Sequence, residues 1–208
     1  MNSIVNTEKR SPKYEFIDDC EYIDGHFLTR IRALRDFGDV KKGDLGGYIE
    51  NEDNLSHEGN CWVYNKARVF QNARVFGNAK VKSFFVDVYG NAQIYDNARV
   101  TDHAHISDNA VICDDAHVGG NAKISGSAYI CDESRVFDDA IVCDALISGN
   151  SYIHSNAFLE ANEDICDNEY PEFGSEDDYY RHEYYADFEG YYDNDDDDDN
   201  SEYETDAA

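Results

Sequence analysis

The chain has 208 residues, of which 13% are aromatic and 41% hydrophobic, enough for one folded domain with a core. Its formal net charge is -28, and 20 of the 45 acidic residues lie after position 160, where they are opposed by Arg181 alone. This charge argues against direct binding to bare nucleic acid or to an anionic membrane, because both would repel the chain.

The sequence predicts a cytoplasmic protein. It has no apolar run long enough to span a bilayer, and residues 1–13 lack the apolar stretch of an export signal. The six cysteines, at positions 20, 61, 113, 131, 143 and 166, form no C-x-x-C pair. We therefore expect reduced thiols and no metal site.

The first part of the chain predicts a small β cap. Residues 1–13 are polar and are expected to be a flexible N-terminus. In residues 14–58, Tyr14–Ile17 and His26–Leu34 alternate like strands, with a turn at Asp24-Gly25 between them. Because the open end of a β-helix exposes unpaired backbone groups, we expect this cap to cover it.

Residues 59–166 repeat with a period of six. An aliphatic residue recurs eighteen times, with one extra residue between Val81 and Val88 and one missing between Val142 and Ile147. A small residue, usually Ala, precedes most of these positions by two, so both point to the same side of a strand. Gly-Asn, Asp-Asn or Asp-Asp pairs suit the corners. Three hexads per coil predict a parallel β-helix of about six coils, ~29 Å long at ~4.8 Å per strand.

The residues of the repeat and the cap resemble known proteins. The hexads, such as Gln71–Phe76 and Asp96–Thr101, resemble the left-handed β-helix of hexapeptide acyltransferases. Upstream, the segments Arg30–Phe37, Asp39–Glu50 and Asn54–Tyr64 resemble the N-terminus of small bacterial and prophage hexapeptide-repeat proteins, usually labelled hypothetical proteins or acyltransferases. The resemblance covers about residues 14–160. It implies an all-β, left-handed parallel β-helix.

An acyltransferase that uses coenzyme A is one functional hypothesis. Such enzymes commonly need a histidine base, and the candidates are His57, His103, His105, His117 and His154. No long inserted loop is available to build a pocket, and the acidic C-terminal end would repel the phosphates of coenzyme A. We therefore favour surface histidines, no catalytic residue and no cofactor.

The repeat also predicts columns of outward side chains. One column is a basic ladder of Lys80, Arg99, His117 and Arg135. A second is an apolar column of Val111, Tyr129 and Leu146, predicted to mediate self-association; the resemblance implies a trimer. One corner collects Asp96, Asp114, Asp115, Asp132 and Glu133, for which a turn-forming role is favoured over calcium binding.

Residues 167–208 form an acidic, tyrosine-rich tail outside the resemblance. The favoured hypothesis is a non-catalytic binding protein whose acidic surface and tail engage a basic protein surface by charge and by stacking on Arg, imitating nucleic acid. In a prophage setting the partner would be a host nucleic-acid-binding or defence protein. A tail that only adds solubility, and a structural or assembly module, are the alternatives. The candidate binding residues are Tyr179, Tyr180, Tyr184, Tyr185, Asp187, Tyr191, Tyr192, Asp195, Asp196, Asp197, Asp198 and Asp199.

Overall fold

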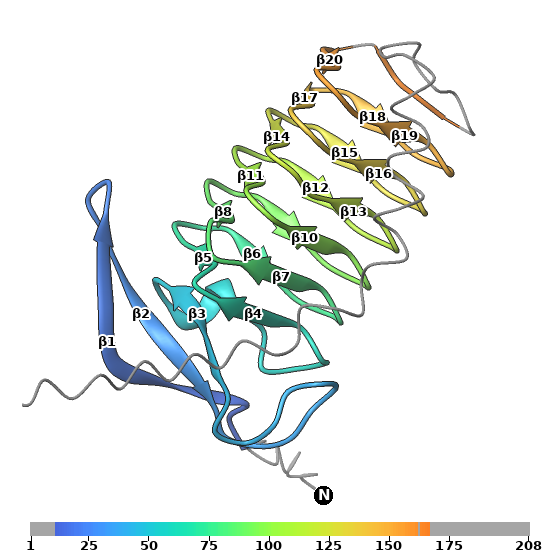
Figure 1. Cartoon of the computed structure of the whole chain (residues 1–208). Helices are drawn as coiled ribbons and strands as arrows, with labels where there is room; N and C mark the ends of the chain where they lie inside the picture. Colours follow the sequence, from blue (N-terminus) through green and yellow to red (C-terminus); the bar gives the residue numbers. More distant parts are fainter. Residues whose placement is uncertain (1–10, 162, 167–208) are drawn as a thin grey trace, which may run out of the picture. The chain divides into compact units, whose positions relative to one another are not determined.

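The computed structural model describes residues 11–161 and 163–166, and the regular secondary structure of these residues is almost entirely β-strand (Figure 1). The helical content of this part of the chain is one short 3-10 turn, η1 (Glu52–Asn54). None of its helices has the length and apolar character that a bilayer crossing requires. The predicted all-β class is therefore confirmed.

A hairpin and a third strand precede the coils. Strand β1 (Tyr14–Ile23) pairs antiparallel with β2 (His26–Ala33) across a turn at Asp24 and Gly25, whose φ angles are 48° and 91°. Strand β2 then pairs antiparallel with β3 (Leu45–Ile49). The predicted turn is confirmed. Strand β1 is longer than predicted, because its pairing with β2 resumes beyond a register shift between Phe16 and Cys20.

Three walls of short parallel strands form the coils (Figure 1). Wall 1 contains β4 (Trp62–Asn65), β7 (Lys80–Ser83), β10 (Arg99–Thr101), β13 (His117–Val118), β16 (Arg135–Val136) and β19 (Tyr152–Ile153). Wall 2 contains β5 (Arg68–Val69), β8 (Asp87–Val88), β11 (His105–Ile106), β14 (Lys123–Ser125), β17 (Ile141–Cys143) and β20 (Phe158–Leu159). Wall 3 contains β6 (Arg74–Val75), β9 (Gln93–Ile94), β12 (Val111–Ile112), β15 (Tyr129–Ile130) and β18 (Leu146–Ile147). The chain is thus a parallel β-solenoid of about six turns, in agreement with the predicted left-handed β-helix.

The inward positions of the hexads build one continuous core. Ile94, Ile112 and Ile130 stack in register on wall 3, and each is 0% exposed. The small residues two positions earlier, such as Ala110, are also fully buried and let the walls approach. Burial of each large aliphatic side chain contributes about 1.5–3 kcal/mol, so the repeat itself supplies most of the hydrophobic stabilisation.

The two irregularities of the repeat lie at corners. The extra residue falls between β7 and β8, where Phe84 and Phe85 are exposed, and Val88 is again in register with Ile106. The missing residue shortens the corner between β17 and β18, and Ile147 still pairs with Ile130. A one-residue insertion and a one-residue deletion are tolerated there because the inward columns are rejoined within one hexad.

Residues in the left-handed backbone region form the corners. Asp96, Asp114 and Asp132 have φ of 55°, 56° and 59° at one corner, and Gly90 has φ of 71° at another. A Cβ atom on Gly90 would lie 2.7 Å from the backbone nitrogen of Asp108 in the next coil, so a side chain is excluded there. Asp tolerates this backbone region better than most residues with a side chain.

The parallel pairing already begins in the cap. Ile49 of β3 pairs with Val69, and Leu55 pairs with Val75, so this segment lies on top of the first coil. Trp62 is 1% exposed beneath the cap. Lys13, fully buried, donates from Nζ to the Cys61 carbonyl at 2.8 Å. The backbone at this end of the solenoid is therefore paired and covered, as a β-sheet edge requires.

Candidate functional site

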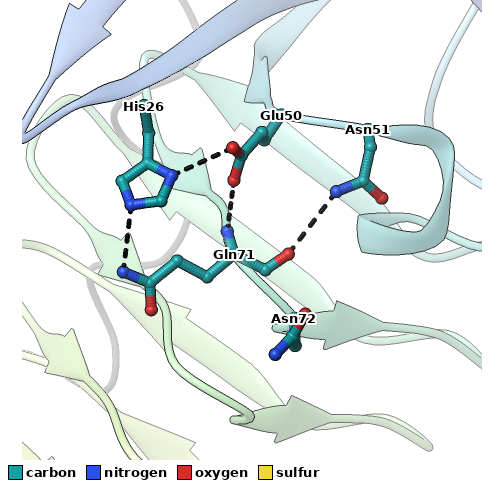
Figure 2. Close-up of a pocket in the computed structure, with 5 residues that line it drawn as sticks. All are labelled: His26, Glu50, Asn51, Gln71 and Asn72. Carbon is teal, nitrogen blue, oxygen red and sulfur yellow. Dashed lines mark hydrogen bonds and ion pairs between the residues drawn. The ribbon is translucent and has the colours of Figure 1, made fainter.

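A polar hollow lies where the β1–β2 hairpin meets the first coils. Its lining residues are His26, Glu50, Asn51, Gln71 and Asn72 (Figure 2). The hairpin supplies His26 at the start of β2, the end of β3 leads into Glu50, and the corner after β5 supplies Gln71. Three segments far apart in the sequence therefore contribute to one site.

Hydrogen bonds indicate which tautomer of His26 suits this site. The Gly90 backbone N–H donates to Gln71 Oε1 at 2.8 Å, which directs the Gln71 amide nitrogen toward His26 Nε2 at 3.3 Å (Figure 2). Since Nε2 then accepts, the proton of a neutral imidazole resides on Nδ1 and is donated to Glu50 Oε1 at 2.9 Å. The Phe70 ring lies 5.4 Å from the imidazole and supports it.

Glu50 is held as a carboxylate. Burial by itself would raise the pKa of Glu50, but the hydrogen bonds from His26 and from the Gln71 backbone N–H, at 2.6 Å, outweigh it and lower the pKa. A neutral imidazole oriented by a carboxylate is an arrangement suited to general-base chemistry. Here, however, the amide of Gln71 already occupies Nε2.

The sequence pattern does not indicate this site. It places His26 only in a strand and Glu50 at the end of a segment that carries the resemblance. The two residues meet because β2 and β3 pair with Thr29 opposite Ile49. The preceding Asp24-Gly25 turn, which places His26 at the start of β2, was the one available signal.

The five histidines proposed as bases are dispersed. His57 accepts from the Lys13 backbone N–H at 3.1 Å, stacks on Tyr14, and has a pKa lowered chiefly by burial. His105 lies 3.6 Å from Asp87, His103 stacks on Phe85, and His154 lies 2.9 Å from the Ser155 hydroxyl. His117 Nε2 lies 3.2 Å from the Thr101 hydroxyl. None of the five lines the hollow.

The basic ladder occupies one outward column of wall 1. Lys80, Arg99, His117 and Arg135 are successive neighbours in the strand register. Asp39 of the cap accepts from Lys80 Nζ and from the Tyr64 hydroxyl, both at 2.7 Å. Burial opposes ionisation of Asp39, but these two bonds prevail and lower its pKa. The cap therefore neutralises the first member of the ladder.

The apolar column lies on wall 3. Val111, Tyr129 and Leu146 are consecutive neighbours in register. Tyr129 is 39% exposed, and its hydroxyl lies 3.3 Å from both Cys113 Sγ and the Tyr95 hydroxyl. These bonds, together with burial, raise the pKa of Tyr129. The stacking required for a self-association surface is present, and self-association stays a prediction.

The corner carboxylates have defined partners within the repeat. Asp114 Oδ2 accepts from the Asp132 backbone N–H at 3.4 Å, and Asp132 Oδ2 accepts from the Gly149 N–H at 2.9 Å. Asp114 and Asp132 therefore each tie their coil to the next. The candidate binding residues of the tail, Tyr179 to Asp199, lie outside the described residues.

Comparisons with known proteins match part of the repeat. A family model described as "YdcK Beta solenoid repeat" matches residues 92–107. The repeat is of the hexapeptide β-solenoid type. A 42-residue stretch is 45% identical to the "Uncharacterized acetyltransferase YdcK" of Escherichia coli K12, covering 20% of this chain and 13% of that protein. The resemblance to solenoid proteins that carry an acyltransferase label is confirmed, and it covers a small share of the relative.

Proposed function

We propose that this protein is a non-catalytic binding protein whose acidic surface engages a basic partner and competes with nucleic acid for it. The observation that carries the proposal is the row of carboxylates along the corner between walls 3 and 1. Asp114 and Asp115 lie on one coil, and Asp132 and Glu133 lie on the next. Bonds to the adjacent coil hold Asp114 and Asp132 in place.

The spacing of these charges is close to that of a nucleic acid. Asp114 with Asp115, and Asp132 with Glu133, place two carboxylates on each of two successive coils, which at a rise of about 4.8 Å gives one negative charge per ~2.4 Å over that stretch. Duplex DNA carries one charge per about 1.7 Å of axis. A rigid row of this density suits a groove that binds phosphates. Because the fold already orders these side chains, binding to a partner costs them little further conformational entropy.

The composition of the tail supports the same function. Residues 167–208 combine a large excess of acidic residues with paired tyrosines at 179–180, 184–185 and 191–192. Charge accelerates association, and aromatic contacts slow release. In a prophage setting, the partner expected is a host nucleic-acid-binding or defence protein.

The test is capture of partners from host lysate by three proteins: the full chain, the chain without residues 167–208, and a corner variant with Asp115→Asn and Glu133→Gln. The proposal expects a basic partner whose binding weakens as salt rises and is competed by duplex DNA. A partner that binds equally well at high salt, or in the presence of excess DNA, would refute the decoy function. If the truncated chain still binds the partner and the corner variant does not, the contact lies on the carboxylates of the corner.

A second candidate function is acyl transfer at the hollow. It rests on the His26–Glu50 pair and on the match to a protein labelled an acetyltransferase. In this function His26 Nε2 would leave Gln71 and take the proton of an acceptor hydroxyl or amine. Acetyl-coenzyme A titrated into the full chain would then bind, and turnover of an acceptor would fall at least 100-fold in His26→Ala. His105→Ala is the matched control. Absence of any binding heat would rule this candidate out.

A further inference from the structure

Two thiols and two carboxylates meet at the corner between walls 3 and 1. Cys113-Asp114 follows β12, and Cys131-Asp132 follows β15 exactly one coil further along the axis. Eighteen residues separate the two dipeptides, so the strand register stacks them. The sequence pattern predicts reduced thiols at the two cysteines and a turn-forming role for the two aspartates.

The donor atoms converge. One oxygen of Asp114, the Sγ of Cys131 and one oxygen of Asp132 all lie within 4.8 Å of one another. Cys113 Sγ lies 3.3 Å from Asp114 Oδ2, at the edge of the same group. Both thiols are more than nine-tenths buried, with exposures of 1% for Cys113 and 9% for Cys131, and both contact the carboxylates.

The electrostatics of this group favour a cation. Among the described residues, no Lys, Arg or His forms an ion pair with Asp114 or Asp132. Two adjacent carboxylates that no described cationic side chain pairs therefore attract a divalent ion.

We propose that Asp114, Cys131 and Asp132, with Cys113 as a fourth donor, bind a thiophilic divalent cation of the zinc class. Thiolate together with carboxylate is a donor set that Zn²⁺ accepts in tetrahedral coordination, whereas Ca²⁺ and Mg²⁺ take oxygen ligands. On binding, each coordinating thiol releases its proton to solvent as the metal–sulfur bond forms. The backbone bonds to Asp114 and Asp132 hold the corner in place before the metal arrives.

The chain contains a matched control for this site. Cys143 and Asp144 repeat the same local motif, with Sγ 3.5 Å from the carboxylate and a left-handed Asp at φ of 57°. The positions one coil before and after it, Ser125 and Glu160–Ala161, offer no second thiol. If cobalt were only attracted nonspecifically to an acidic surface, it would bind at the single Cys143-Asp144 motif as well as at the stacked pair.

The experiment is a cobalt titration of the reduced full-length chain, followed by absorption. We expect a thiolate-to-cobalt charge-transfer band with the visible bands of tetrahedral Co²⁺, bleached by one equivalent of Zn²⁺. The band should weaken in Cys131→Ser and be lost when Cys113 and Cys131 are both changed to Ser, its midpoint should shift at least 10-fold in Asp132→Asn, and Cys143→Ser should leave both the band and the midpoint unchanged. Affinity should rise with pH, because thiol protons are displaced.

Two results would overturn the proposal. One is the absence of a charge-transfer band, since cobalt held by surface carboxylates alone produces none. The other is a band that survives the loss of both Cys113 and Cys131 or disappears in Cys143→Ser. Circular dichroism of the metal-free variants confirms that they are folded, and the Asp132→Asn titration provides an independent readout because it leaves both thiols in place.

Discussion

At the scale of single residues, each hexad assigns opposite environments to adjacent side chains. Ile124 is 0% exposed in the core, whereas Lys123, its neighbour in β14, is exposed on wall 2. The alternation follows from the pleat of a strand, in which successive side chains point to opposite faces. The effect of a substitution should therefore depend on whether the side chain points into the core or outward, more than on its position along the solenoid.

Ile124→Asp should unfold the solenoid at moderate temperature, because an unpaired charge would enter the core at a cost of about 4 kcal/mol or more. Lys123→Asp is the matched control and should change stability by less than about 0.5 kcal/mol. Thermal melts by circular dichroism measure both. Equal tolerance of the two substitutions would contradict the strand register.

Glu50 provides a pH prediction at the same scale. Its pKa is lower in the folded protein than in the unfolded chain, so the stability it contributes is present above its ordinary pKa. That stability is lost as pH falls through the folded pKa, in the acid range below about pH 4.5. Glu50→Gln should therefore flatten the loss of unfolding free energy between pH 5 and pH 3, measured by urea denaturation. Glu133→Gln, on the exposed corner, should keep the steeper wild-type dependence.

At the scale of elements, the three walls differ in what they present. Wall 1 carries the basic ladder, and wall 3 carries the apolar column of Val111, Tyr129 and Leu146. The strands are similar in backbone, so the outward residue of each hexad decides which surface a wall offers. Exposed aromatic and aliphatic side chains stacked in adjacent coils form a continuous apolar strip, which is the form an association surface takes.

If wall 3 mediates self-association, Tyr129→Glu should lower the molar mass in solution, because a charge would be buried in an apolar contact. Tyr129→Phe removes the bonds to Cys113 and Tyr95 but keeps the apolar ring, so its mass should match the parent. Light scattering coupled to size exclusion gives the masses. The same mass for the parent and the Glu variant would count against this surface.

At the scale of the whole molecule, the net charge of -28 dominates. Along the corners, carboxylates recur at the spacing of one coil, so they repel one another in the folded state more than in an extended chain. The bonds from corner Asp side chains to backbone N–H groups offset part of this repulsion. Screening by salt should therefore favour the folded protein.

The melting temperature should rise as sodium chloride increases from about 10 mM to about 500 mM, since the screening length falls from ~30 Å to a few ångströms. The slope should be smaller in the Asp115→Asn, Glu133→Gln double variant, which removes two adjacent corner charges. Differential scanning calorimetry at fixed pH provides the measurement. A melting temperature that falls with salt would show that favourable ion pairs outweigh the repulsion.

The sequence by itself determined the repeat, its inward columns and its corners. Ala110 and Ile112 could be assigned to the core and Asp114 to a turn, because the alternation of side chains along a strand and the left-handed corners are local properties, read from neighbouring residues. The stacking of Val111 on Tyr129 followed from the eighteen-residue period alone. The cap hairpin was also predictable, through its Asp24-Gly25 turn.

The two candidate sites were decided by the tertiary structure. His26, Glu50 and Gln71 meet only because β2 pairs with β3 and β3 lies on β5, which are contacts outside the repeat period. The convergence of Asp114, Cys131 and Asp132 also depended on side-chain direction at the corner, although their stacking was implied by the period. Periodicity fixes which residues are neighbours; where their polar atoms point is set by hydrogen bonds from other coils, and a one-dimensional pattern does not contain these.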